Sequence, residues 1–391
     1  MPIKDAPVYL DAAQRFRTLF HDAHTHAAYA PGRFEVLGNH TDYNEGFVLS
    51  AATNFGTYAL ASPRADDRCE LTSLSVSHSA HSTVNGLAPE PETSWANYVW
   101  GVLAGLRTLG QVSTGCNILV AGDLPLGAGL ASSAALEIST GLVLSTLYGI
   151  SVSRLDLARI GQRAEQEFVG ANTGLLDQIS SLHGESHQLV MTDFRTLEVE
   201  TLPFAKDMCF VMCNTRVNHA LSDGQYNDRR KHCEDAAIFF DGVLDHEVTA
   251  LRDVSWVEWQ EHHQGMDEIR ARRCAHPIGE NDRVIRGRDL LMRGDLDGLG
   301  ALMYESHQSS SEYFENSCPE LDFVVATARS IPGVLGARLS GGGFGGSAIL
   351  LTHSRDTDVI MHATTSAYRN EYDRDCETRR LIPSPGASLI G

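Results

Sequence analysis

Residues 125–139 (PLGAGLASSAALEIS) combine glycines and serines with the start of an apolar helical run, and this combination suits an anion. Gly127 and Gly129 carry no Cβ atom and tolerate positive φ, so neighbouring N–H groups can turn toward a phosphate. Ser132 and Ser133 stand where a helix would begin, and the free N–H groups of a helix N-terminus bind anions. No Gly-Lys-Ser/Thr follows, so this is not a Walker loop. A glycine-rich turn before a buried helix is the structural alternative.

Two other glycine-containing segments add polar side chains. Residues 31–46 (PGRFEVLGNHTDYNEG) gather arginine, histidine, carboxylates and amides directly after a strand-like run at 34–37. Residues 340–346 (SGGGFGG) lie between strand-like runs at 336–339 and 347–351. These three motifs, in this order, resemble the GHMP family of small-molecule kinases. The His-Thr-Asp-Tyr-Asn of the first motif resembles the galactokinase branch of that family.

The resemblance covers nearly the whole chain, and several short matches extend it. They are WANYV at 95–99, LDQ at 176–178, ESH at 305–307 and SCPELD at 317–322. So many matches in one order are poorly explained by chance. The resemblance implies an α+β, two-domain GHMP kinase fold with the active site in the cleft between the domains. It also implies an ATP-dependent sugar 1-kinase that uses Mg²⁺ and converts D-galactose to galactose 1-phosphate.

Asp177 is the best candidate for the group that handles the nucleophile. Phosphoryl transfer needs a positioned acceptor, neutralised phosphates and a group that orients or deprotonates the nucleophile. Asp177 follows Gly174 among apolar neighbours, and a buried carboxylate there would need a partner such as Arg33. The resemblance implies that Asp177 and Arg33 flank the attacking sugar hydroxyl. Whether Asp177 acts as a base or as an electrostatic orienter stays open, and helix capping is its structural alternative.

The resemblance assigns the remaining roles residue by residue. The sugar would be bound by Asn39, His40, Asp42, Gly174 and Tyr226. The nucleotide would be bound by Trp95, Gly127, Gly129, Leu130, Ala131, Ser132, Ser133, Gly342 and Gly343. Ser133 and Glu165 would supply the hard oxygen ligands that Mg²⁺ requires. Glu165 could instead be an exposed helical residue, and Trp95 could belong to the core packing of its helix.

Two positions depart from the family pattern and bear on the sugar. Galactokinases usually have glutamate where this chain has Asn39, and that carboxylate ordinarily accepts from the sugar C6 hydroxyl. Asn39 can accept and donate but carries no charge. The family commonly has lysine or arginine at the position of Asn218, and Arg216 lies two residues away on the same strand face. A kinase for a C6-modified sugar such as galacturonate is therefore the close alternative.

A non-catalytic sugar sensor on the same fold is a second alternative. Such a sensor is expected to have a damaged phosphate loop. Ser132, Ser133, Glu165 and Asp177 are all present here, and their retention favours an enzyme.

The residues with chemical roles must be positioned by early strands and later helices. In the first half we expect a helix from Ala12 to Phe20, an irregular stretch at His21–Tyr29, strands at 33–37, 47–52, 57–62, 70–76 and 116–120, and helices at Trp95–Leu109 and after a Ser153 N-cap. In the second half we expect strands at 187–191 and 208–213, helices between about 222 and 330, and a last helix near 356–370. This order favours α+β. We place the domain boundary at residue 186, giving domains 1–186 and 187–391.

Composition limits the partners and the compartment. The 391 residues carry a net charge of −19, which argues against nucleic acid or an anionic membrane as partner. The eight cysteines form no C-x-x-C pair, so reduced thiols fit better than disulfides. No apolar run approaches 18 residues, and the N-terminus shows no signal-peptide core. We expect a cytoplasmic monomer whose partners are a small-molecule sugar and ATP.

Overall fold

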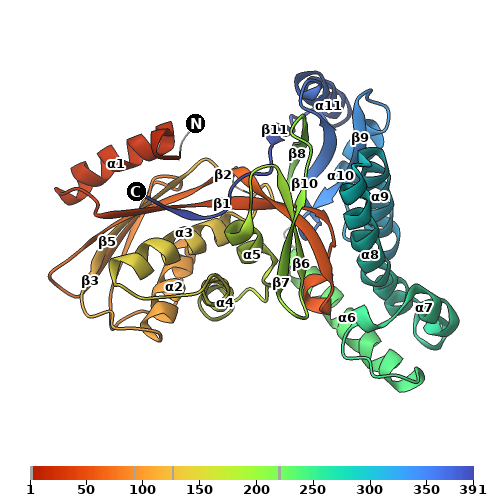
Figure 1. The fold of residues 1–391 in the computed structure, drawn as a ribbon, viewed down its shortest axis with the longest axis horizontal. Coiled ribbons are helices and arrows are strands. Elements are labelled where there is room, and N and C mark those ends of the chain that lie inside the picture. Colours follow the sequence, from red (N-terminus) through yellow and green to blue (C-terminus); the bar gives the residue numbers. More distant parts are fainter. Residues whose placement is uncertain (1–2, 92–93, 126, 219–221) are drawn as a thin grey trace.

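The computed structural model describes residues 3–91, 94–125, 127–218 and 222–391 (Figure 1). Within these residues an eight-stranded sheet has the order β12-β1-β2-β5-β3-β4, with β6 paired to β2 and β7 to β6. Its strands are β1 (His26–Leu37), β2 (Phe47–Pro63), β3 (Arg68–Ser73), β4 (His78–Thr83), β5 (Cys116–Gly122), β6 (Gln188–Asp193), β7 (Glu198–Pro203) and β12 (Ser388–Ile390). All of its pairings are antiparallel except that of β3 with β5.

Helices cover both faces of this sheet. On one face lies α1 (Pro7–Phe20), whose Phe16 packs against Tyr58 and Leu60 of β2. The other face is covered by α2 (Asn97–Arg107), α3 (Ser132–Leu147), α4 (Arg154–Ala164) and α5 (Leu176–His183), as Figure 1 shows. Ser153 caps α4 as predicted, because its Oγ accepts from the N–H of Asp156.

Two predictions for β1 and β2 are wrong. β1 begins at His26, inside the stretch expected to be irregular, because Ala27 and Ala28 are buried in the cores on opposite faces of the sheet. The expected strands at 47–52 and 57–62 form one continuous strand. The residues between them suggested a turn, yet the N–H of Gly56 donates to the carboxylate of Asp123 at 2.8 Å and the strand continues.

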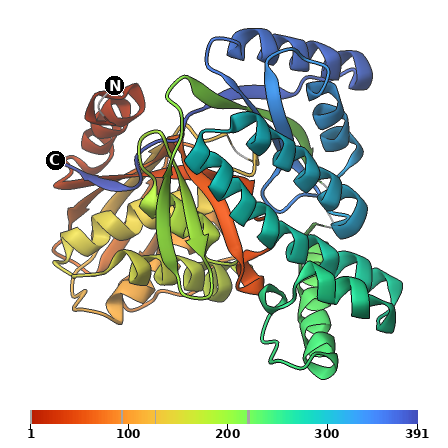
Figure 2. The ribbon, with the colours of Figure 1, turned by 45° about the vertical axis from the view of Figure 1, so that its right-hand side comes forward.

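A second sheet of four strands has the order β11-β8-β10-β9. Its strands are β8 (Met208–Asn218), β9 (Val334–Ser340), β10 (Gly345–His353) and β11 (Glu377–Leu381). The helices of this part are α6 (Ser222–Val243), α7 (Trp256–His262), α8 (Glu268–Arg293), α9 (Leu296–Ser309), α10 (Pro319–Ala328) and α11 (Thr357–Tyr372). Figure 2 shows α6 and α7 extending away from the rest of the molecule. The predicted series of helices between about 222 and 330 is confirmed.

Short helical turns complete the described chain. Turns of 3₁₀ helix span Ile3–Asp5, Asp42–Asn44, Ser94–Ala96, Leu251–Asp253 and His263–Gly265, and π-helical turns span Glu165–Val169 and Ser310–Phe314. π-helical turns often occur at functional sites. None of the described helices is both long and apolar enough to cross a membrane.

The two sheets share a core, which fixes the positions of the first and third motifs. Phe34 and Leu49 of the first sheet pack with Phe210, Met212 and Ile349 of the second. Strands β6 and β7 follow residue 186 but pair within the first sheet. The chain therefore passes from the first sheet to the second between β7 and β8. The domain boundary at 186 stays a prediction.

Candidate active site

The predicted phosphate loop ends at an uncapped helix N-terminus. Gly127, Gly129 and Ala131 have φ angles of 69°, 70° and 54°, all in the left-handed region. Helix α3 begins at Ser132, and the methyl side chain of Ala131 at the N-cap offers no hydrogen-bond acceptor. Among the described residues no side chain accepts from the first N–H groups of α3. A bound anion would satisfy them.

Arg33 connects this loop to Asp177. Its Nε and Nη2 both lie 2.7 Å from Oδ1 of Asp177, and its Nη1 donates to the carbonyl of Gly129 at 2.6 Å. The backbone N–H of Arg33 also donates to the carbonyl of Leu130. One guanidinium thus joins a carboxylate at the start of α5 to the loop before α3. The predicted pair of Arg33 and Asp177 is formed in the structure.

A cavity of about 190 Å³ contains both candidate catalytic residues and all five candidate sugar-binding residues. It is lined by Arg33, Glu35, Asn39, His40, Asp42, Thr173, Gly174, Leu176, Asp177, Tyr226, Gly341 and Gly342. These residues come from β1, the loop after it, the start of α5, α6 and the third motif. We refer to this cavity as the Asp177 cavity.

Close packing positions Asp42 in this cavity. A Cβ atom on Gly174 would lie 1.9 Å from Oδ2 of Asp42, so only glycine fits at position 174. Burial raises the pKa of Asp42 to about 6, and the negative charges of Glu35 and Asp177 add to the rise. Asp42 can accept hydrogen bonds from hydroxyl groups when it is ionised.

His40 is held by the protein through both ring nitrogens. Nε2 lies 3.0 Å from the carbonyl of Gly342, which can only accept, so Nε2 carries the proton. Nδ1 then accepts from the hydroxyl of Tyr43 at 2.9 Å. Burial lowers the pKa of His40 to about 4, which keeps the ring neutral near pH 7. The ring lies 5.2 Å from that of Tyr226, so His40 also positions an aromatic wall of the cavity.

Asn39 ties the first motif to the third. Its Nδ2 donates to the carbonyl of Gly341 at 2.8 Å, and its Oδ1 accepts from Nδ2 of Asn316 at 2.9 Å. The side chain is buried, with 1% of its residue surface exposed. Each polar atom of the amide therefore has a protein partner already. The side chain of Asn218, the other departure from the family pattern, lies outside the part of the chain that the structure describes.

Trp95 and the two serines of the phosphate loop line a second cavity, of about 170 Å³. Its lining is Thr57, Ser73, Ser75, Val76, Trp95, Tyr98, Val120, Ala121, Gly122, Leu124, Ser132, Ser133 and Leu136. An apolar recess with an aromatic ring, adjoining an anion-binding helix end, suits a nucleotide. We refer to it as the Trp95 cavity.

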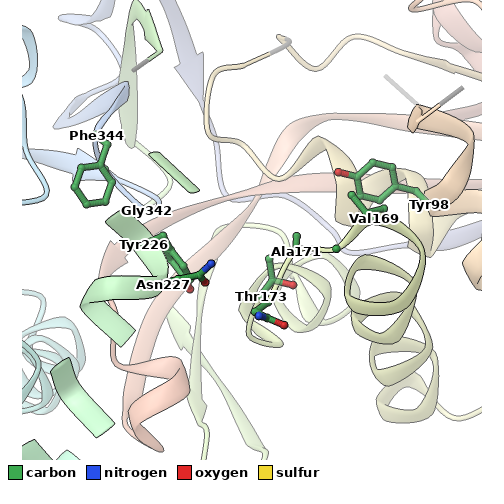
Figure 3. Close-up of a pocket in the computed structure, with 11 residues that line it drawn as sticks. Tyr98, Val169, Ala171, Thr173, Tyr226, Asn227, Gly342 and Phe344 are labelled. Atoms are coloured by element: carbon green, nitrogen blue, oxygen red, sulfur yellow. The ribbon is translucent and has the colours of Figure 1, made fainter. Parts of the chain in front are cut away.

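A third cavity, of about 440 Å³, shares residues with both of the others. Figure 3 shows Tyr98, Val169, Ala171 and Thr173 on one side of it and Tyr226, Asn227, Gly342 and Phe344 on the other. Tyr98 also lines the Trp95 cavity, and Thr173, Tyr226 and Gly342 also line the Asp177 cavity. Gly342 and Gly343, expected near the nucleotide, lie here rather than beside Trp95.

Comparisons with known proteins agree with this geometry. The family model for the GHMP kinases N terminal domain matches residues 97–185, that for GHMP kinases C terminal matches 288–370, and the galactokinase galactose-binding signature matches 14–63. A galactokinase of Haemophilus influenzae (strain PittGG) is 38% identical over 345 residues, which covers 87% of this chain and 88% of that protein. The chain belongs to the galactokinase branch of the GHMP kinases.

Solved structures support the same family and fold. Lactococcus lactis galactokinase complexed with galactose superposes with a TM-score of 0.92 at 30% identity, covering 97% of this chain and all of that one. Methanococcus jannaschii mevalonate kinase has a TM-score of 0.63 at 16% identity over 93% of this chain, and this likeness shows the fold alone. The predictions of family and of an α+β GHMP fold are confirmed.

The two candidate magnesium ligands of this GHMP kinase lie close together. The buried carboxylate of Glu165 accepts from Thr173 and, at 3.4 Å, from Gln178, and the hydroxyl of Ser133 is near enough to lower the pKa of Glu165. Burial raises the pKa of Glu165, with the hydrogen bond from Thr173 opposing the rise. The described residues contain no cluster of three or more histidine, cysteine or carboxylate side chains that could hold a metal. A hydroxyl and one carboxylate fit Mg²⁺, which also takes phosphate oxygens and waters.

Two buried carboxylates near the predicted site residues, Glu137 and Glu35, were not singled out in the sequence. Glu137 on α3 accepts from Gln178 through Oε2 at 2.9 Å, and its Oε1 is buried without a partner among the described residues. Burial raises the pKa of Glu137 well above its usual value, and repulsion from Glu165 adds to it. Glu35 lines the Asp177 cavity. The sequence offered one signal for each. Glu137 is a lone acid in an apolar helix, and Glu35 follows Arg33 by two residues, which places both on the same face of a strand.

Proposed function

We propose that this chain is an ATP-dependent sugar kinase that phosphorylates the anomeric hydroxyl of D-galactose to give galactose 1-phosphate. Relatives that are called galactokinases support the reaction and the sugar. The observation that carries the proposal is the position of Arg33. Its guanidinium contacts Asp177 in one cavity and the phosphate loop at Gly129, so the acceptor site and the phosphate site adjoin.

The free oxygen of Asp177 defines the place of the nucleophile. Both contacts from Arg33 go to Oδ1, and no other hydrogen bond among the described residues involves Oδ2. In our proposal Oδ2 accepts a hydrogen bond from the anomeric hydroxyl of the sugar and orients its oxygen for in-line attack. The bond from that oxygen to the γ-phosphorus forms while the bond from phosphorus to the β,γ-bridging oxygen breaks. ADP leaves, and the hydroxyl proton passes to Asp177 and then to solvent.

The phosphate groups would lie against the start of α3. There the N–H groups at Ser132 and Ser133 face no capping side chain, and they would stabilise charge on the transferring phosphoryl group. The adenine would enter the Trp95 cavity, which Ser133 also lines.

We infer that Ser133 and Glu165 hold Mg²⁺. The ion would neutralise phosphate charge when bound. The buried, unpartnered Oε1 of Glu137 supports a cation here, because Glu137 is repelled by the negative charges of Glu165 and Asp177, and a bound cation would offset that repulsion.

We also infer a reducing, cytoplasmic location, because all eight cysteines are buried and free. The monomeric state stays a prediction from the sequence.

A coupled ADP-release assay with a panel of free sugars tests the function. We expect galactose to stimulate ADP release, with a product that carries phosphate on C1. Stimulation by galacturonate but not galactose would replace the proposed substrate by a C6-modified sugar. ATP binding without stimulation by any sugar would favour the non-catalytic sensor.

A further inference from the structure

The Asp177 cavity contains a carboxylate for which the reaction gives no role. Glu35 lies on β1 two residues after Arg33, so both side chains leave the strand on the same face. It lines the cavity together with Asn39 and Asp42, although only 2% of its surface is exposed. A buried carboxylate is costly unless its charge and its hydrogen bonds are satisfied, so each of its oxygens has to be accounted for.

One oxygen of Glu35 has a protein partner. Oε1 accepts from Nη1 of Arg338 at 2.9 Å, and Arg338 on β9 is completely buried. Oε2 takes part in no hydrogen bond among the described residues. It is also not one of the polar atoms that are completely buried without a partner, so part of it is exposed. Oε2 is therefore free to accept a hydrogen bond from a ligand in the Asp177 cavity.

The backbone around Glu35 holds the carboxylate in place. Its N–H donates to Oγ of Ser340 at 2.9 Å, and that hydroxyl also contacts the carbonyl of Glu35 at 3.2 Å. Ser340 begins the third motif, so Glu35 is fixed to both sheets. Arg338 also lies 4.0 Å from Glu280, a second buried acid that balances its charge. A rigid acceptor of this kind is suited to selecting a ligand by its hydroxyl pattern.

Asn39 does not supply the Asp177 cavity with a charged acceptor for the sugar. The family carboxylate at that position is missing here, and the amide that replaces it bonds to Gly341 and Asn316 instead. An amide oxygen that already accepts one bond, and an amide nitrogen with one remaining hydrogen, supply no negative charge to the cavity. The acidic side chains that line the cavity are Glu35, Asp42 and Asp177, against the single guanidinium of Arg33.

We propose that Glu35 is a sugar-binding residue that supplies, from β1, the carboxylate that position 39 lacks. Its Oε2 accepts a hydrogen bond from a hydroxyl group of the bound hexose, and its charge selects neutral sugars over uronic acids. The inference rests on the proposed kinase function and disfavours the galacturonate alternative. A second carboxylate brought beside Glu35 and Asp42 would be repelled in a cavity largely closed to water.

The test measures kcat/KM for galactose and for its 2-, 3-, 4- and 6-deoxy derivatives in the wild type and in Glu35→Gln. Glutamine keeps an oxygen for Arg338 but removes the charge. We expect kcat/KM for galactose to fall roughly ten- to hundredfold, mainly through the KM of the sugar, with the KM of ATP unchanged. In the wild type each deoxy sugar has a lower kcat/KM than galactose, and we call this decrease its penalty. For one deoxy sugar the penalty should largely disappear in the variant, and this sugar identifies the hydroxyl that Glu35 binds.

Two further variants keep the test decisive. Glu35→Asp keeps the charge but withdraws the oxygens by one methylene, so it should lose the same hydroxyl contact and still reject galacturonate. Glu35→Gln should accept galacturonate better, relative to galactose, than the wild type does. Glu200→Gln, on β7 with its carboxylate paired to Arg288, is the matched control and should change neither ratio.

The pattern of penalties decides the outcome. Unchanged deoxy-sugar penalties in both Glu35 variants, with only the melting temperature lowered, would show that Glu35 is a counterion of Arg338 and overturn the proposal. A wild-type protein that phosphorylates none of these sugars would overturn the proposed function, and the role of Glu35 with it.

Discussion

Replacing Asp177 by asparagine separates the charge of this residue from its shape. Arg33 contacts only Oδ1, and an asparagine oxygen can accept at the same place, so the arginine should keep its bond to Gly129. The Oδ2 atom becomes an amide nitrogen, which donates where the attacking hydroxyl needs an acceptor. A positioned general base contributes about 10²–10⁴-fold to rate. We therefore expect kcat to fall by about that factor, which is about 2.7–5.4 kcal/mol at ~1.36 kcal/mol per tenfold.

The assay is steady-state ADP release with galactose and ATP varied independently. The KM of ATP should stay near the wild-type value, because Asp177 lies outside the lining of the Trp95 cavity. Asp207→Asn is a suitable control, since that carboxylate is 74% exposed and lines none of the three cavities. An Asp177→Asn enzyme with near-normal kcat would refute the reasoning and leave Asp177 as a partner of Arg33 alone. Thermal melting of both variants excludes misfolding as the cause of lost activity.

Three further predictions follow from the same sites. Ser133→Ala and Glu165→Ala should each shift the Mg²⁺ titration of activity to higher concentration, and an unchanged titration in both would remove the proposed ligands. Asn39→Glu should lower stability by about 1–3 kcal/mol in urea unfolding, because a carboxylate would face the carbonyl of Gly341 without a donor; an unchanged midpoint would contradict this. Since the pKa of Asp42 is raised to about 6, kcat/KM for the sugar should fall as pH falls through 6 and the acceptor is protonated. Asp42→Asn should remove that limb, and its persistence would assign the limb to another group.

The amino-acid sequence by itself determined the local parts of this protein. The phosphate loop before α3 depends on glycines and small residues that are neighbours in the chain, and their backbone preferences act within a few positions. The Ser153 cap of α4 is a local effect of the same kind. Local signals failed where burial opposed them, as at His26–Tyr29, which was expected to be irregular but forms a strand whose alanines fill both faces of the sheet.

Contacts between distant residues were decided only by the tertiary structure. The pairing of Arg33 with Asp177 joins residues 144 positions apart. The sequence pointed to it only through the need of a buried carboxylate for a partner and through the family resemblance. The hydrogen bond that the side-chain amide of Asn316 donates to Asn39 spans 277 positions. It changes the interpretation of Asn39, which in the sequence looked like a residue that contacts the sugar directly. Glu35 looked like one acid in a strand until packing placed it in the cavity against Arg338. A side chain's partners follow from how the sheets pack, and residue types near it in the chain do not encode that packing.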